Sequence, residues 1–331
     1  MVTVAHGWLV MADNFIYNGQ VFSAEDKIIG PSSRALRYGD GLFETLRMKQ
    51  GRIPLADFHF DRLFRGLNTL QFPVPSAFNI DFLLKQIDQC ASANYLLDEA
   101  RVRLNVFRSE GSLQSPTDNS PNFIIEATAL DPAYTNLNAE GWTVDIYPHA
   151  RKSCDLFSPL KHNNFQPYLM AALFANAHHL DDSIVLNQYE RIADSTTANI
   201  FLVKNNVIIT NPVEEGCVDG VLRRFLSQKM KGAKIDLCWK AIHIHDLLDA
   251  DEVFLTNAVA QMRWVKQFRK KSLRPDFHFL EYGVNTVYGS PLSLTTSFLS
   301  KITWSLKSEN STPYFFNKAL MFSSRLIAYG S

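Results

Sequence analysis

A glycine at the start of a predicted helix offers the clearest local site for a ligand. In GCVDGVLRRFLSQKM (216–230), Gly220 precedes the helical pattern, so the amides of Val221 and Leu222 would have no partner within the helix. Free N–H groups and the helix dipole attract an anion such as a phosphate. A glycine in this position can equally be a simple cap, so both interpretations stay open.

Lys161, within SPLKHNNF (158–165), is a lysine whose role the residues alone leave open. An amine attacks a carbonyl only when it is neutral, and burial lowers the pKa of a lysine towards that state. Lys161 lies between a Pro-Leu pair and a run of asparagines, just before an apolar helix. By itself, an isolated lysine is more often a solvated surface charge.

Basic residues recur along RVRLNVFR (101–108), which reads as a strand. Guanidinium groups bind carboxylates through paired hydrogen bonds, so Arg103 and Arg108 are candidates for binding an acidic substrate group. Arg101 lies on the same segment, and the pattern does not decide which of the three points inward. An exposed strand face with alternating charge is an equally good interpretation.

Two histidine-containing segments resemble metal or catalytic sites but do not require either. His243, His245 and Asp246 lie together, yet no second cluster completes a metal site, so we expect a helix start or a solvated strand edge. His178 and His179 end an apolar helix, where their charge suits the helix dipole. We therefore predict no metal site.

The composition favours a small-molecule enzyme over a nucleic-acid or membrane protein. Lys plus Arg and Asp plus Glu are 33 each, so no basic surface for a polyanion is indicated. The chain has 331 residues and no apolar stretch long enough to span a bilayer, and we expect no signal peptide. Four scattered cysteines match neither a zinc pattern nor a disulfide framework, which suggests a cytoplasmic protein with reduced thiols.

The first half of the chain reads as an α+β unit that would position these residues. A hairpin is expected at 14–30 around Asn18-Gly19, and a loop after Ser33 leads into a strand at 42–48. Helical periodicity and strand alternation place the remaining elements, namely helices at 57–70 and 81–91 and strands at 101–108 and 122–130.

The second half mixes strands and helices without a regular βαβ alternation, so a doubly wound parallel sheet is not favoured. The expected strands are 141–150, 183–187, 191–195, 198–203, 207–210 and 251–257, and the expected helices are 166–180 and 221–230.

We divide the chain into a leader (1–13), a small N-terminal domain (14–130), a larger domain (131–270) and an atypical tail (271–331). Met11 could equally be the natural start. The tail holds eleven serines and eleven aromatic residues but only three acidic residues, and it has no clear period.

Six stretches occur in the order typical of one enzyme family. They are RYGDGLFETLR (37–47), HFDRL (59–63), SPLKHNNF (158–165), ADSTTANIFLV (193–203), GCVDGVLRRF (216–225) and DEVFLTNAV (251–259). Together they resemble the class IV, or fold type IV, aminotransferases that depend on pyridoxal 5′-phosphate (PLP). The resemblance covers about residues 14–270. It implies a two-domain α+β fold like that of D-amino-acid aminotransferases, whose larger domain is built on a β-barrel-like sheet, and a homodimer.

The resemblance also implies roles for individual residues. Lys161 matches the Schiff-base lysine, and Asp194 stands where the family usually has a Glu facing the pyridine nitrogen. Because Asp is one methylene shorter, either its strand lies closer to the ring or a water bridges the gap. The family binds the phosphate through residues that correspond to Arg62, the amides of Val221 and Leu222, and Thr256. His59 is expected to be a structural partner of the site.

For the substrate, Tyr38 matches a tyrosine of the branched-chain members, and Arg103 and Arg108 lie where members often bind carboxylates. The implied activity is amino-group transfer between an amino acid, possibly branched-chain, and a 2-oxo acid. The alternative is 4-amino-4-deoxychorismate lyase, which YGDGLFET and Asp219 favour. A D-amino-acid aminotransferase and a non-catalytic family member are less favoured.

Overall fold

The fold is seen in a computed structural model that describes residues 12–134, 138, 140–232 and 235–273. Most of the predicted leader and nearly all of the predicted tail lie outside these residues. No helix in the described part of the chain is long and apolar enough to cross a membrane.

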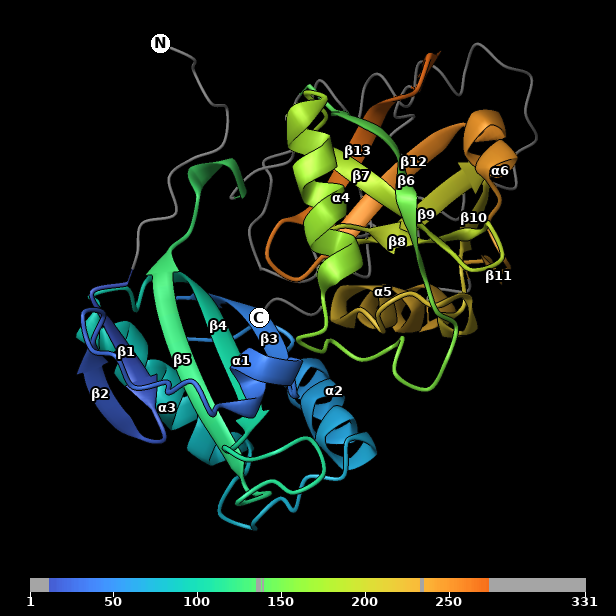
Figure 1. Ribbon diagram of the computed structural model, residues 1–331. Coiled ribbons are helices and arrows are strands. Elements are labelled where there is room, and N and C mark those ends of the chain that lie inside the picture. The colour runs from blue at the N-terminus through green and yellow to red at the C-terminus, as the bar shows by residue number, and fades with distance from the viewer. Residues whose placement is uncertain (1–11, 135–137, 139, 233–234, 274–331) are drawn as a thin grey trace. The chain divides into compact units, whose positions relative to one another are not determined.

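The first sheet is antiparallel throughout, with the order β2-β1-β5-β4-β3 (Figure 1). Its strands are β1 (Asn14–Tyr17), β2 (Gln20–Ser23), β3 (Gly41–Lys49), β4 (Glu99–Arg108) and β5 (Pro121–Ala129). Tyr17 pairs with Gln20, and both turn residues between them have positive φ, 46° at Asn18 and 90° at Gly19. These values suit a tight hairpin turn, so the predicted hairpin is confirmed, although its second strand ends at Ser23.

Two amphipathic helices cover this sheet, α2 (Ala56–Thr69) and α3 (Ile80–Ala93). Leu63, Leu67 and Ile87 are buried in the core that they share with the strands. The predicted loop after Ser33 instead contains the short helix α1 (Arg34–Tyr38). Five residues are too few to show a helical period, which is why the sequence pattern missed it.

The second sheet is mixed and curls into part of a barrel, with the order β11-β10-β9-β12-β13-β6-β7-β8 and β14 paired to β13. Its strands are β6 (Trp142–Lys152), β7 (Asp182–Asn187), β8 (Ile192–Ser195), β9 (Asn199–Lys204), β10 (Val207–Thr210), β11 (Leu237–Trp239), β12 (Glu252–Asn257), β13 (Gln261–Phe268) and β14 (Lys271–Ser272). Parallel pairing occurs at β6/β7, β6/β13 and β10/β11. The predicted α+β class is therefore confirmed, whereas β11, β13 and β14 were not predicted.

Three helices accompany this sheet: α4 (Gln166–Ala177) along β6 and β7, α5 (Val221–Gly232) along β11 and β12, and the short α6 (Ile244–Asp249). Single turns of 3₁₀ helix lie at Pro132–Tyr134 (η1) and Val213–Glu215 (η2). His243 is the N-cap of α6 and forms a capping box with Asp246, which confirms the helix-start interpretation. His178 is the C-cap of α4, as its position suggested.

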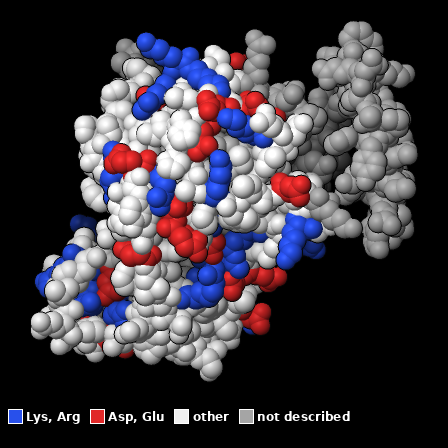
Figure 2. Space-filling model, turned by 90° about the vertical axis from the view of Figure 1, so that its right-hand side faces the viewer, with Lys and Arg blue, Asp and Glu red and all other residues white. Residues whose placement is uncertain are grey.

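Charges of both signs are interspersed over the face in Figure 2, without a large area of one sign. This agrees with the equal numbers of acidic and basic residues in the chain. On that face, a phosphate backbone would find no continuous basic surface.

Candidate active site

One cavity of about 320 Å³ brings together residues from both sheets and from α2 and α5. Seven of the predicted site residues line it: Arg62, Arg103, Lys161, Asp194, Val221, Leu222 and Thr256. These residues are spread over nearly 200 positions of the chain, so only the tertiary fold unites them.

Lys161 is held in the cavity by backbone hydrogen bonds to the start of β3. The N–H of Phe43 donates to the Lys161 carbonyl at 2.9 Å, and the N–H of Asn163 donates to the Gly41 carbonyl at 2.9 Å. The ammonium nitrogen lies 4.4 Å from the centroid of the Phe43 ring. Desolvation, followed by the nearby charge of Arg62, lowers the pKa of Lys161 to about 7. A large share of the amine is therefore neutral near pH 7, as a nucleophile requires.

Arg62 is fixed by a buried carboxylate, Glu44 of β3. Its Nε donates to Glu44 Oε1 at 2.8 Å and its Nη2 to Glu44 Oε2 at 2.5 Å, while Nδ1 of His59 lies 2.7 Å from Oε2. Burial would raise the pKa of Glu44, but Arg62 and His59 lower it to about 2. His59 therefore acts through this carboxylate, in agreement with the structural role expected for it.

Glu44 is a site residue that the sequence analysis did not single out. It lies within FET of the first matching stretch, two residues before Leu46, and only the fold shows that it faces α2. Arg62 also donates from Nη1 to the Asp219 carbonyl at 3.1 Å, which ties α2 to the loop before α5.

The start of α5 forms a polar end of the cavity. Val221 is the first residue of the helix, so its amide and that of Leu222 have no acceptor within the helix. A Cβ at Gly220 would overlap the side chain of the buried Asn199, so this close approach favours glycine there. Thr256 contributes a buried hydroxyl that has no partner among the described residues. Backbone donors, a helix dipole and an unpaired hydroxyl suit a phosphate group.

Asp194 lies in β8 and is only 2 % exposed. Burial raises its pKa, and Lys152 is the first of the neighbours that oppose this effect. Its carboxylate accepts hydrogen bonds from the Tyr168 hydroxyl and the Val218 N–H. A carboxylate that accepts these hydrogen bonds can also accept one from a protonated ring nitrogen.

Two arginines of β4, Arg101 and Arg103, both line the cavity. They are two residues apart and therefore on the same face of the strand. The guanidinium carbon of Arg103 lies 4.0 Å from the centroid of the Phe43 ring. Burial and the nearby charge of Arg101 lower the pKa of Arg103. Neither arginine forms an ion pair with any residue that the structure describes, so both can receive a carboxylate.

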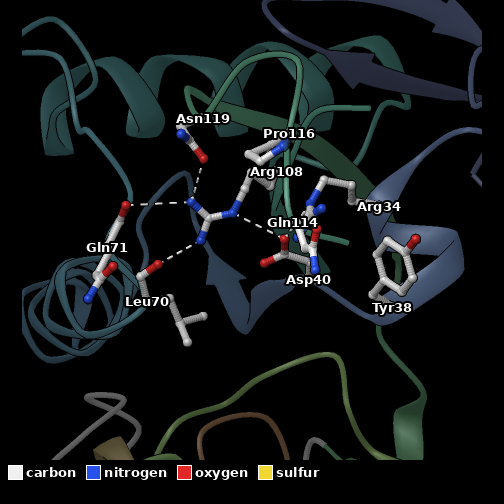
Figure 3. A pocket seen from close by; sticks show the side chains of 9 residues that line it. All are labelled: Arg34, Tyr38, Asp40, Leu70, Gln71, Arg108, Gln114, Pro116 and Asn119. Atoms are coloured by element: carbon white, nitrogen blue, oxygen red, sulfur yellow. Dashed lines mark hydrogen bonds and ion pairs between the residues drawn. The ribbon is translucent and has the colours of Figure 1, made fainter. Parts of the chain in front are cut away.

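Tyr38 and Arg108 lie elsewhere, in a second cavity of about 500 Å³ (Figure 3). Arg108 is five residues from Arg103, so the alternation of the strand turns it to the other face. There its Nε pairs with Asp40 at 3.1 Å and its Nη2 donates to the Leu70 carbonyl at 2.6 Å. This chain thus does not bring Tyr38 or Arg108 to Lys161, and their substrate-binding role stays a prediction.

The described residues contain no group of three or more His, Cys, Asp or Glu side chains that could hold a metal ion. The residues around Lys161 instead fit PLP: a neutral lysine amine for its aldehyde, an acid for its ring nitrogen and an anion-binding helix start for its phosphate. The unpaired Thr256 hydroxyl, which is buried and lines the cavity, is the observation that favours this group.

Comparison with known proteins agrees with this fold. The family model for amino-transferase class IV matches residues 41–268. An aminodeoxychorismate lyase of Bacillus subtilis is 28% identical over 248 residues, which cover 74% of this chain and 83% of the relative. A putative branched-chain-amino-acid aminotransferase of Methanocaldococcus jannaschii is 28% identical over 250 residues, covering 74% and 84%.

Among solved structures, the branched-chain amino acid aminotransferase of Escherichia coli superposes with a TM-score of 0.71 at 23% identity, covering 79% of this chain and 88% of that one. This likeness shows the fold of a type IV enzyme. The chain belongs to the class IV aminotransferase family. It is an enzyme, and its cofactor is pyridoxal 5′-phosphate, as the sequence predicted.

Proposed function

We propose that this enzyme is an aminotransferase that moves an amino group between an amino acid and a 2-oxo acid. When bound, PLP supplies an aldehyde that takes up the amino group and a ring that accepts negative charge. The observation that carries the proposal is the lowered pKa of Lys161, about 7, beside two arginines without ion pairs.

Lys161 would both bind the cofactor and move protons. A neutral amine with a pKa of about 7 can take a proton from the Cα of the substrate and return it elsewhere. A proton carrier works best when its pKa lies near the working pH. Arg101 and Arg103 would hold the substrate carboxylate and so orient the Cα hydrogen towards the amine.

The other residues would hold the cofactor. Asp194 would keep its ring nitrogen protonated, and Thr256 with the amides of Val221 and Leu222 would bind its phosphate. Arg62 would contribute positive charge near the phosphate while Glu44 keeps it in place.

Aminodeoxychorismate lyase is the second candidate, because a relative with that name covers 74% of this chain. Asp219, the sequence feature that favoured the lyase, does not lie where it could contact a substrate beside Lys161. Its carboxylate contacts Arg65 at 2.9 Å and Arg223 at 3.2 Å, and it does not line the cavity with Lys161. Asp219 is thus engaged in packing the loop against α2 and α5.

The two activities are separable with purified PLP-loaded enzyme. Single L- and D-amino acids are added without an oxo acid, and the cofactor absorbance is followed. For an aminotransferase, one amino acid should convert the absorbance stoichiometrically, and 2-oxoglutarate should restore it. Release of pyruvate and 4-aminobenzoate from aminodeoxychorismate, with no such conversion by any amino acid, would instead identify the lyase.

We also propose a cytoplasmic homodimer. Helix α4 is apolar on both sides: Ala171 and Ala175 are buried, whereas Leu169 is 52% and Leu173 61% exposed. An exposed apolar helix face favours burial against a second subunit. A mass measured by light scattering should be that of a dimer, and Leu173→Glu should shift it towards the 37.6 kDa monomer. A monomeric unaltered protein would contradict this proposal.

A further inference from the structure

Asp194 is surrounded by hydrogen-bond donors. The Tyr168 hydroxyl lies 2.9 Å from Oδ1 and 2.8 Å from Oδ2, and the Val218 N–H donates to Oδ2 at 2.9 Å. Tyr168 comes from α4, is 5% exposed and also lines the cavity. Because an ionised carboxylate only accepts hydrogen bonds, these donors favour the ionised form of Asp194.

A second buried lysine stands behind Tyr168. Lys152, the last residue of β6, is 8% exposed. Its ammonium donates to the Tyr168 hydroxyl oxygen, lies 3.5 Å from the Ser158 carbonyl, and is 3.9 Å from Asp194 Oδ2. A tyrosine hydroxyl has one hydrogen, so a hydroxyl that accepts from Lys152 directs that hydrogen to Asp194. Hydrogen bonds therefore run in one direction, from Lys152 through Tyr168 to Asp194.

We propose that Lys152 is a positioning residue that acts through the Tyr168 hydroxyl to keep Asp194 ionised and oriented in its buried place. Lys152 does not line the cavity, so it would influence the cofactor only through Asp194. These hydrogen bonds would also hold the carboxylate of the shorter Asp194 side chain in position, so the length of the side chain alone would not determine where the carboxylate lies.

The charges around Asp194 support this role. Burial raises the pKa of Asp194, and Lys152 is the strongest of the groups that lower it, ahead of the Val218 amide, Tyr168 and Arg223. Arg223, on α5, already binds the Asn211 carbonyl at 2.6 Å and Asp219 at 3.2 Å.

Two further titratable neighbours stay uncharged near neutral pH, whereas Lys161, which interacts with Asp194 and has a pKa of about 7, is partly charged there. Burial raises the pKa of Cys217 to about 12 and that of Tyr168 well above its usual value, so both stay protonated. Lys152 pairs with Asp194 at 3.9 Å and forms no ion pair with any other described residue.

The first experiment uses the cofactor-free protein with ¹³C-labelled aspartate. The Asp194 carboxyl signal is assigned by its loss in Asp194→Asn, and its pH titration is compared in Lys152→Met and in the control Lys204→Met. Lys204 is a partly exposed lysine paired with Asp249 at 3.3 Å. We expect Lys152→Met to raise the midpoint by about one to three pH units. A midpoint that matches the control would overturn the proposal.

Tyr168→Phe tests the path and guards against misfolding of the lysine variant. It removes the hydroxyl but keeps the ring and both charges, and thermal melting checks that it folds. We expect it to raise the same midpoint, and Lys152→Met should add little in the Tyr168→Phe background. Fully additive shifts in the double variant would show that Lys152 acts without Tyr168 and would reject the path.

The effect on the cofactor rests on the proposed role of Asp194 and is tested separately. In PLP-loaded protein, the pH midpoint of the visible absorbance should move in the same direction in Asp194→Asn, Lys152→Met and Tyr168→Phe. If Asp194→Asn leaves it unchanged, the ring-nitrogen role of Asp194 fails, while the carboxyl titration still decides the role of Lys152. If only Asp194→Asn moves it, Lys152 does not influence the cofactor, which contradicts the proposal.

Discussion

Both cavities described above contain arginines, but the arginines of β4 that line them are in opposite states. In the second cavity, Arg34 and Arg108 share the Asp40 carboxylate at 2.8 and 3.1 Å and donate to backbone carbonyls (Figure 3). In the cavity with Lys161, Arg101 and Arg103 have no ion pair with any described residue.

This difference separates a structural site from a reactive one. A guanidinium whose hydrogen bonds are satisfied within the protein stabilises the fold and has little left for a ligand. Around Lys161, desolvation and the charges of Arg62 and Arg103 act on one amine and lower its pKa to about 7. Both cavities contain arginines, so the presence of these residues alone does not identify the active site.

The largest effect should follow from Lys161→Ala. Removal of the amine should abolish the visible absorbance of the bound cofactor and lower the turnover by about 10²- to 10⁴-fold or more, since proton transfer is lost as well. Absorbance spectra and steady-state rates provide the measurement, with Lys204→Ala as the control. An unchanged spectrum would mean that another lysine binds the cofactor.

The next largest effect concerns the buried pair of Arg62 and Glu44. Arg62→Met leaves the Glu44 carboxylate buried without its main partner and should lower the free energy of unfolding by about 3–5 kcal/mol. Arg65→Met is a matched control on the same helix, because Arg65 is 53% exposed and should cost about 1 kcal/mol or less. Urea unfolding of the cofactor-free protein measures both. Equal losses of unfolding free energy in the two variants would show that the buried Arg62–Glu44 pair stabilises the fold no more than an exposed pair does.

A third prediction tests the difference between the two sets of arginines. Arg103→Met should raise the KM for the amino acid by about 10- to 100-fold, the range expected for one lost hydrogen bond to a charged group. The exposed Arg269→Met serves as control. For Arg108→Met we expect the loss to appear mainly in unfolding, because its contacts are internal. A raised KM in Arg108→Met at unchanged stability would instead support its predicted role in substrate binding.

The smallest effect is on pH dependence. The folded pKa of Lys161 is depressed, so its reactive neutral form is gained as the pH rises through about 7. The rate at which cofactor-free protein binds PLP should follow that curve, as measured by the growth of visible absorbance. Arg103→Met removes a cation that lowers this pKa, so the midpoint should move upward. A midpoint near the ordinary lysine value of 10.5 in the unaltered protein would refute the assignment.

Much of the fold could be read from local patterns. The Asn18-Gly19 turn, the helices beginning near Ala56 and Ile80, and the start of α5 at Val221 all follow from turn chemistry and helical periodicity. Short elements such as α1 and β11 were missed because three to five residues cannot show a period.

The sequence by itself determined the family and the cofactor, because six short stretches occur in a set order, and it predicted Lys161 as the residue that binds the cofactor. It also offered three arginines in one segment without distinguishing them. Only the tertiary structure decided that Arg101 and Arg103 line the cavity with Lys161 while Arg108 is bound to Asp40, that Glu44 pairs with Arg62, and that Lys152 contacts Tyr168 and Tyr168 contacts Asp194. The physical reason is that pairing and desolvation depend on neighbours distant in sequence, which a local pattern of residues does not contain.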